Sequence, residues 1–343
     1  MTSLERALAA IGQREPDRVP LFLLLATYGA RELGMPVKEY FSRAENVVEA
    51  QLRMRKKYDS DCLYAFFYAG VEAEAFGGST IFRENAAPNV GAPVVCTKAD
   101  IESLKAPRVR ECEPLCRVLD AISGMKKEAG ADVPIVGVAM SPFSLPAMQM
   151  GFESYLNLLY SDSEHFRRLM AVNEEFCAEW ANAQLEAGAT AICFFDPLAS
   201  PTIIEKETYM RIGYETDKRA IGSINGPVAV HLASGATLPV IDEVVSTGAC
   251  ILGFSCRDDI RAVKEAARGR ICLIGNLNGI EMANWDAARA EEEIKKLITG
   301  AGEGGGLIIS DNHGEIPYSV PEEVILAVSE AARRYGKYPL GVN

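Results

Sequence analysis

Only three histidines occur among the 343 residues, and two of them follow short apolar runs. His313 lies in SDNHGEIPYSVP, and His231 lies in AVHLASGAT. An acid, Asp196, holds the same kind of position in FFDPLAS. An imidazole exchanges a proton near neutral pH, and imidazole or carboxylate groups can bind zinc. His231, His313 and Asp196 are therefore the candidate catalytic residues and also the candidate metal ligands.

The third histidine differs from these two. His165 falls in the first turn of a predicted helix, between charged residues, and is expected to face solvent. A lone histidine after a strand is often structural, bonded to a neighbouring carbonyl. Two histidines and an acid that follow strands at one edge of a sheet favour a functional role instead.

The apolar runs predict the elements that position these residues. Each run is four to eight residues long, as in buried parallel strands, and each leads into a helical pattern. The runs lie at 19–25, 61–67, 134–139, 190–195, 227–230, 249–254, 271–274 and 306–309. Eight such repeats predict an α/β fold, a (β/α)8 TIM barrel, with catalytic groups at the carboxyl ends of the strands.

Other features refine this prediction. An open doubly wound sheet is the alternative, but the turn LATYGARELG lacks the glycine pattern that follows the first strand of such folds. Residues 68–97 predict an extra hairpin near the barrel mouth, and 36–57 and 162–187 predict long helices. We expect one domain over residues 1–343.

Composition excludes several classes of partner. The net charge of −12 argues against binding to nucleic acid or to an anionic membrane surface. The apolar run VPLFLLLA is too short to cross a bilayer, and the first residues do not resemble a signal peptide. Nine cysteines, an odd number scattered through apolar stretches, indicate reduced thiols. The expected location is the cytoplasm.

Several stretches occur in an order that resembles the uroporphyrinogen decarboxylase superfamily. They are FFDPLASPTIIEKETYMRIGYE, AVHLASGATLPVIDEVVSTGACILGFS, LIGNLNG and LIISDNHGEIPYSVPEEVILAV. The earlier REPDRVPLFL and SPFSLPAMQMGFESYLNLLYSDSE extend the resemblance over nearly the whole chain. It implies a (β/α)8 barrel and either of two activities: decarboxylation of uroporphyrinogen, or methyl transfer with a corrinoid protein.

The residues depart from the decarboxylase branch. That branch carries an arginine-rich segment after the first strand, where this chain has LLLATYGARELG with only Arg31. The positions of the family's catalytic Asp and active-site Tyr fall at about Phe67 and Met148. Only the late His313–Gly314 pair is shared. A lyase acting on a smaller acid remains an alternative, as does a noncatalytic metabolite-binding barrel.

The residues also depart from the thiol-methylating branch. Its zinc site uses a His-x-Cys motif and a later Cys, but here His231 is followed by Ala233, and His313 takes the later position. A methylcobalamin:thiol methyltransferase is therefore a second alternative. Zinc is still allowed with a carboxylate as the third ligand. The candidate carboxylates are Asp196, Glu72, Glu74 and Glu315.

The variant DNHGEIP is more similar to the methyltransferase I component of O-demethylases. This resemblance implies methyl transfer from an aryl methyl ether to cob(I)alamin on a partner corrinoid protein, and a homodimer is allowed. The ether oxygen would need a proton donor or Lewis acid, and the ring an apolar slot. Core packing is the alternative role for part of the apolar set. The candidate substrate-binding residues are Glu74, Asn276, Phe66, Phe67, Tyr68, Phe143, Met148, Met150 and Tyr318.

Overall fold

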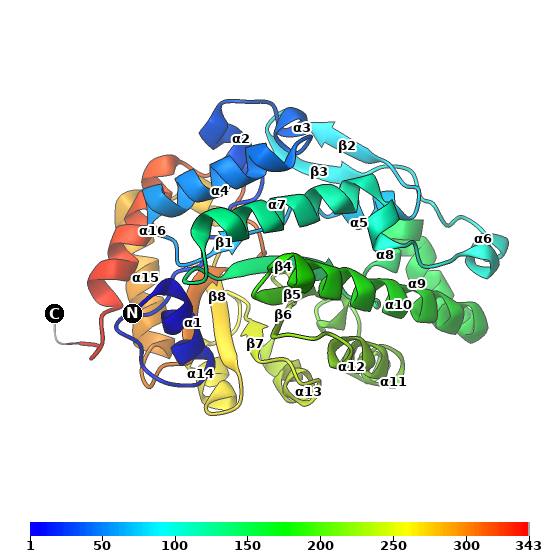
Figure 1. The fold of residues 1–343 in the computed structure, drawn as a ribbon. Helices are drawn as coiled ribbons and strands as arrows, with labels where there is room; N and C mark the ends of the chain where they lie inside the picture. The colour runs from blue at the N-terminus through cyan, green and yellow to red at the C-terminus, as the bar shows by residue number, and fades with distance from the viewer. Residues whose placement is uncertain (342–343) are drawn as a thin grey trace.

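The computed structural model describes residues 1–341, which are built around a curled parallel sheet of seven strands (Figure 1). The strand order is β1-β4-β5-β6-β7-β8-β9, so strands that follow one another along the chain are neighbours in the sheet, apart from a separate hairpin. The strands are β1 (Leu63–Tyr64), β4 (Ile135–Met140), β5 (Ala191–Phe195), β6 (Val228–His231), β7 (Ile251–Gly253), β8 (Cys272–Leu277) and β9 (Leu307–Asp311).

The first predicted strand, 19–25, is not a regular strand. Leu21 forms a single parallel bridge with Ile309 of β9, and the Phe22 amide donates to the Ile309 carbonyl at 2.9 Å. On the other side the Asp61 amide donates to the Leu21 carbonyl, at 2.7 Å. The Leu21 amide instead donates to the side chain of Asp61, at 2.9 Å, which replaces a regular ladder bond. The prediction of eight regular strands is therefore confirmed only in part, as a curled seven-stranded parallel sheet.

Helices surround the sheet (Figure 1). The first eight are α1 (Ser3–Ile11), α2 (Tyr28–Leu33), α3 (Val37–Tyr40), α4 (Ala44–Tyr58), α5 (Gly70–Ala75), α6 (Lys98–Ser103), α7 (Glu113–Ala129) and α8 (Pro146–Met150). The others are α9 (Phe152–Ser161), α10 (Ser163–Ala187), α11 (Lys206–Ile212), α12 (Tyr214–Gly222), α13 (Ile241–Ser246), α14 (Ile260–Ala267), α15 (Ala287–Ala301) and α16 (Glu322–Tyr335). Short 3₁₀ turns lie at Val109–Glu111, Pro197–Ala199, Leu238–Val240 and Glu281–Asn284.

Helix boundaries follow local sequence signals. The predicted helix at 162–187 is confirmed as α10, because the Asp162 side chain caps its start and Gly188, at φ 118°, ends it. The predicted helix at 36–57 is interrupted. Arg43 is extended, with φ −140° and ψ 136°, and separates α3 from α4.

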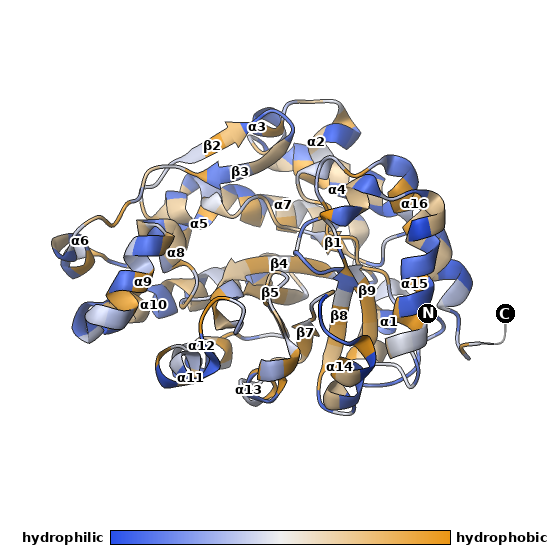
Figure 2. Ribbon diagram, turned by 180° about the vertical axis from the view of Figure 1, so that it is seen from behind, coloured by the Kyte–Doolittle hydropathy of each residue, from blue (hydrophilic) through white to orange (hydrophobic). Residues whose placement is uncertain are grey.

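Side chains alternate between the interior of the curled sheet and the surrounding helices. On β5, Cys193 and Phe195 belong to the interior cluster, whereas Ile192 and Phe194 belong to the cluster under the helices. Figure 2 shows β4, β8 and β9 largely in the hydrophobic colour, as expected for strands buried on both faces. This alternation decides which side chain at each strand end faces inward.

The predicted extra hairpin is present. Strands β2 (Thr80–Arg83) and β3 (Ala86–Val90) pair antiparallel and contact α3 and α5. None of the helices within residues 1–341 is long and apolar enough to cross a membrane.

Candidate functional site

The carboxyl ends of the strands, at Phe195, His231, Gly253, Leu277 and Asp311, form one edge of the sheet, the mouth. His231 ends β6, is 2% exposed and packs beside Phe195, with 4.9 Å between ring centroids. On the next strand, a Cβ at Gly253 would come 2.6 Å from His231 Cδ2. The missing side chain of Gly253 therefore leaves room for the imidazole.

The turn after β6 fixes the protonation of His231. The Ala233 amide donates to His231 Nδ1 at 3.1 Å, so the neutral ring carries its proton on Nε2. Burial lowers the pKa of His231 to about 4, with His313 acting in the same direction and the Asp311 backbone opposing, so the ring is neutral at pH 7. Nε2 makes no hydrogen bond of normal geometry among residues 1–341, although the Asp311 backbone acts on the ring and opposes the lowering of its pKa. Ala233 and Ser234 have φ 44° and 72°, and such left-handed backbone costs about 1–2 kcal/mol per residue.

His313 lies in the turn after β9, and Asp311 shapes that turn. Asp311 Oδ2 accepts hydrogen bonds from the His313 amide at 2.7 Å and the Gly314 amide at 2.8 Å. His313 itself is partly exposed. Burial lowers its pKa, and Arg257 adds to the effect. Both histidines are therefore neutral imidazoles at neutral pH, and each lies within electrostatic range of the other.

Asp311 is a site residue that the sequence analysis did not propose. Its side chain is fully buried, and Oδ1 has no hydrogen-bond partner in the described chain. Burial raises the pKa of Asp311 to about 6. The Tyr64 hydroxyl donates to the Gly314 carbonyl at 2.7 Å, which ties the same turn to β1. The available signal was an acid two residues before a histidine at the end of the last strand.

Asp196 is not brought together with the histidines. Its Oδ1 accepts from the hydroxyls of Ser141 and Ser144, both at 2.7 Å. Burial raises the pKa of Asp196, and burial together with the neighbouring Asp196 raises that of Asp217 further. Because Phe195 faces the interior, the next side chain turns to the helix side, where Asp217 of α12 lies. The Asp196 amide still contacts the site, donating to the His231 carbonyl at 2.9 Å.

The predicted aromatic residues separate into two groups. Phe67 and Tyr68 pack on Phe41 in the outer cluster, with centroid distances of 5.4 and 5.3 Å. Phe66 instead packs on Phe195 at 6.0 Å, at the edge of the interior cluster that Met140 also borders. The interior wall of the mouth is therefore formed by Phe66, Met140 and Phe195.

The remaining predicted contacts lie apart from this wall. Glu74 accepts from the Tyr68 hydroxyl at 3.2 Å, and Met148 and Tyr318 pack partly buried against the outer cluster. The Asn276 amide donates to the Ser255 carbonyl at 3.1 Å. Asn276 also lines a groove that leads outward from the mouth, together with Cys256, Arg257, Asn278 and Glu281.

The predicted zinc ligands do not fit a metal ion in this arrangement. Within residues 1–341 no group of three or more His, Cys, Asp or Glu side chains is arranged to hold one. The Asp196 carboxylate is bonded to two serines on the helix side of β5. We therefore derive no step of the chemistry through zinc.

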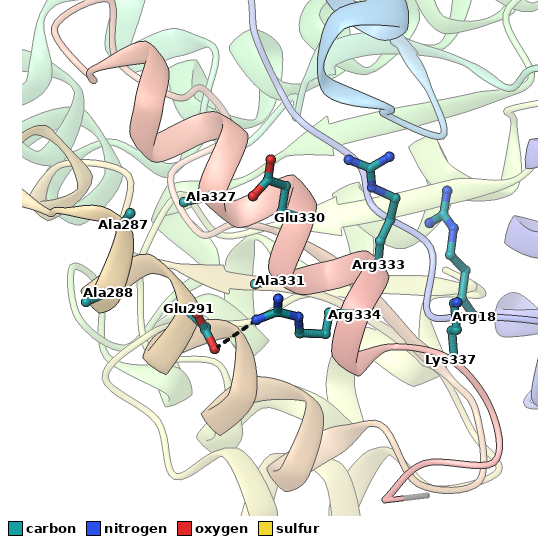
Figure 3. A pocket seen from close by; sticks show the side chains of 10 residues that line it. All are labelled: Arg18, Ala287, Ala288, Glu291, Ala327, Glu330, Ala331, Arg333, Arg334 and Lys337. Atoms are coloured by element: carbon teal, nitrogen blue, oxygen red, sulfur yellow. Dashed lines mark ion pairs between the residues drawn. The ribbon is translucent and has the colours of Figure 1, made fainter. Parts of the chain in front are cut away.

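Another groove lies on the outer surface, between α15 and α16 (Figure 3). Alanines of both helices lie along it, and Arg334 pairs with Glu291 across it, at 3.7 Å. Arg18, Arg333 and Lys337 lie together at one end. Its lining residues do not include the histidines or Asp311.

Comparison with known proteins identifies the family. The model of the family "Uroporphyrinogen decarboxylase (URO-D)" matches residues 2–335. The chain belongs to the URO-D family. Uroporphyrinogen decarboxylase of Idiomarina loihiensis is 23% identical, with 96% of each chain covered. Uroporphyrinogen decarboxylase of Escherichia coli O157:H7 is 25% identical, with 97% of this chain and 98% of the relative covered.

Solved structures agree on the fold. A methyltransferase from Methanosarcina mazei matches this URO-D family chain with a TM-score of 0.87 and 21% identity, covering 98% of this chain and 99% of the other. A B12-independent methionine synthase from Shewanella sp. W3-18-1 matches with a TM-score of 0.55 and 14% identity, covering 84% and 88%. The match to the family model confirms the predicted superfamily.

Proposed function

We propose that this URO-D family chain is a corrinoid-dependent methyltransferase that moves a methyl group from an aryl methyl ether to cob(I)alamin on a partner corrinoid protein. The observation that carries the proposal is the composition of the mouth. Neutral His231 packs beside Phe195, which forms an apolar wall with Phe66 and Met140, and His313 lies in the turn that Phe195 contacts at Gly314. A planar apolar ring with one ether oxygen matches this pairing.

The apolar residues and the histidines of the mouth have different roles in the proposed reaction. The wall of Phe66, Met140 and Phe195 holds the ring and excludes water from the reacting carbon. The corrinoid of the partner protein would supply the nucleophile that takes the methyl group. As the methyl–oxygen bond breaks, its electron pair stays on the oxygen, and an imidazole N–H of His231 or His313 stabilises the developing phenolate charge.

Neutral imidazoles hold their proton and act as hydrogen-bond donors, not as acids. The proton that finally neutralises the phenolate therefore comes from another group or from solvent. Asp311 is such a group, because its pKa of about 6 leaves part of it protonated near neutral pH and its Oδ1 has no hydrogen-bond partner in the described chain.

Decarboxylation is the alternative function, favoured by the names of the sequence relatives. Arg31, which stands in for the decarboxylases' arginine-rich segment, donates to the Val320 carbonyl at 2.8 Å and lies over the Tyr28 ring. Phe67, at the position of the catalytic Asp, is packed in the outer cluster. The one observation that favours an acidic substrate is Arg257, which lowers the pKa of His313 from the rim of the mouth.

The test is anaerobic mixing of the protein with cob(I)alamin and a panel of methoxybenzoates and methoxyphenols, with and without candidate corrinoid proteins. Conversion of the cob(I) spectrum to methylcobalamin, abolished in His313→Ala and kept in His165→Ala, is the expected result. His165 is the matched control, because it is the one histidine outside the mouth and bonds Asp162 and Glu102 instead. No conversion with any donor would favour the decarboxylase alternative.

A further inference from the structure

Asn312, between Asp311 and His313, is 1% exposed, and two backbone groups set the orientation of its amide. The Leu277 carbonyl can only accept a hydrogen bond, and the Cys256 amide can only donate one. The Asn312 side chain is satisfied when its Nδ2 donates to Leu277 O at 2.9 Å and its Oδ1 accepts from Cys256 N at 3.2 Å. The ends of β7 and β8 thereby hold the amide from both sides.

This orientation fixes the ring of His313. The second hydrogen of Asn312 Nδ2 then points to His313 Nδ1, 2.8 Å away. A nitrogen that accepts a hydrogen bond carries no proton, so the neutral ring of His313 is protonated on Nε2. Gly279 passes close by, since a Cβ there would be 3.4 Å from the same Nδ1, and the ring has little room to turn over.

We propose that Asn312 is a positioning residue that locks His313 in its Nε2–H form, so that the mouth presents two imidazole N–H donors for an anionic oxygen and no imidazole nitrogen free to bind a metal. His231 reaches the same form by a different route, through the Ala233 amide. The two histidines thus share one protonation pattern, although their supports lie on different turns.

The contrast with a metal site is direct. A histidine that ligates a metal through Nε2 donates its Nδ1–H to an acceptor such as a carboxylate or a carbonyl. Here each Nδ1 meets a donor instead: the Asn312 amide at His313 and the backbone amide of Ala233 at His231. A neutral imidazole that binds zinc through Nε2 must carry its proton on Nδ1. At both histidines this proton would point at an N–H donor, so the surroundings oppose zinc binding.

The protonation state of each ring nitrogen can be measured by NMR, because the chain has only three histidines. Long-range ¹H–¹⁵N correlation spectra of protein labelled in histidine, recorded at pH 8, distinguish a protonated ring nitrogen from a bare one. We expect the Nε2–H form for both mouth histidines. A His313 signal in the Nδ1–H form, or a one-equivalent zinc titration that shifts both His231 and His313, would overturn the proposal.

Two variants test the role of the amide. Asn312→Asp replaces the donor with an acceptor, so His313 should change to the Nδ1–H form, and Asn312→Ala should give a mixture of forms. Asn278→Asp is the matched control: it makes the same change of side chain just beyond β8, but Asn278 accepts from the Glu281 amide, which a carboxylate also binds. An unchanged His313 in both Asn312 variants would contradict the proposal. If Asn312→Asp does not fold, the tautomer of His313 in the wild type and in Asn312→Ala tests the proposal.

The rate of methyl transfer tests whether the tautomer of His313 matters for catalysis. This measurement, unlike the spectra, rests on the proposed function. Asn312→Asp should reduce methyl transfer by about 10²-fold or more, the range for the loss of one hydrogen-bond donor to a developing oxyanion. Absence of methyl transfer in the wild type would count against the proposed function. It would not change the tautomers of His231 and His313 determined from the spectra. A full wild-type rate in a variant with the Nδ1–H form would show that the His313 tautomer does not matter for catalysis.

Discussion

The ring of Phe195 lies against the backbone of Gly314, and a Cβ added at residue 314 would come within 2.0 Å of Phe195 Cζ. Gly314 also has φ +87°, where a side chain is strained. This contact joins the end of β5 to the turn that carries His313. It places a phenyl ring beside His231 and between the two turns that support the proposed chemistry.

Gly314→Ala should therefore destabilise the protein by about 1–3 kcal/mol through overpacking, with further loss from backbone strain. Denaturant unfolding measures the change. The double variant Phe195→Ala/Gly314→Ala removes the clash but not the strain, so it should be more stable than the sum of the single variants predicts. Strict additivity would show that the two residues do not press on each other.

A second prediction concerns Asp61, at the opposite end of the sheet. Its carboxylate is 1% exposed and bonds Arg6 Nη1 at 2.6 Å, Arg18 Nη1 at 2.7 Å and the Leu21 amide at 2.9 Å. Asp61→Asn leaves the buried Arg6 and the partly buried Arg18 guanidinium groups without their shared carboxylate, and should cost about 3–5 kcal/mol. Chemical denaturation measures this cost.

The neighbouring exposed acid is the control for Asp61. Asp59 pairs with Arg18 at 3.7 Å and with Arg333 at 3.6 Å, in contact with solvent. Asp59→Asn should cost less than about 1 kcal/mol. Similar costs for the two variants would show that the segment at 19–25 does not depend on the Asp61 carboxylate.

The third prediction uses the buried carboxyl pair of Asp196 and Asp217. Burial raises the pKa of both groups, and the nearby Asp196 raises that of Asp217 further. Their neighbours Tyr209, Tyr155 and Cys177 are also buried, with raised pKa values, and stay neutral. An acid whose pKa is raised in the folded state stabilises the fold less as pH rises above its ordinary value of about 4.

The wild type should therefore lose stability between about pH 4 and the raised pKa of the folded pair, and then level off. Asp217→Asn replaces one of the two buried carboxyl groups with an amide, which does not titrate. Its melting temperature should fall less than that of the wild type between pH 5 and 8. The exposed Asp120→Asn is the control, and a parallel pH dependence for all three proteins would show that the buried carboxyl pair does not cause the loss of stability.

The sequence predicted the positions of strand ends better than the sides to which their residues point. Seven of the apolar runs are strands, and His231 and His313 lie at the mouth as expected. Asp196 and Phe67 instead face the helices, while Phe66 borders the interior cluster and Asp311 acts electrostatically on Tyr64 and Cys193 of that cluster. Strands buried on both faces have no alternation of polar and apolar residues, so the sequence holds no signal for the inward side.

The contacts of the histidines could not be read from the sequence either. The Ala233 amide reaches His231 only because residues 233 and 234 adopt left-handed backbone, which neither Ala nor Ser favours. The Asn312 amide reaches His313 only because β7 and β8 end beside it. The first contact depends on a backbone conformation that the residue types do not signal, and the second depends on segments distant in sequence, in contrast to the local capping signals that predicted α10.

The last prediction tests whether the space left by Gly253 holds His231 in place. An alanine Cβ at this position would lie 2.6 Å from His231 Cδ2 and 3.0 Å from Cγ, closer than real contacts allow. The ring must then turn away from the Ala233 amide, while φ at residue 253 is not in the left-handed region and the backbone itself tolerates alanine. Gly253→Ala should cost about 1–3 kcal/mol of stability and change the His231 ring signals, with those of His165 unchanged. If the His231 signals and methyl transfer both match the wild type, the imidazole is not positioned by its fit over β7, and the Ala233 hydrogen bond alone sets its state.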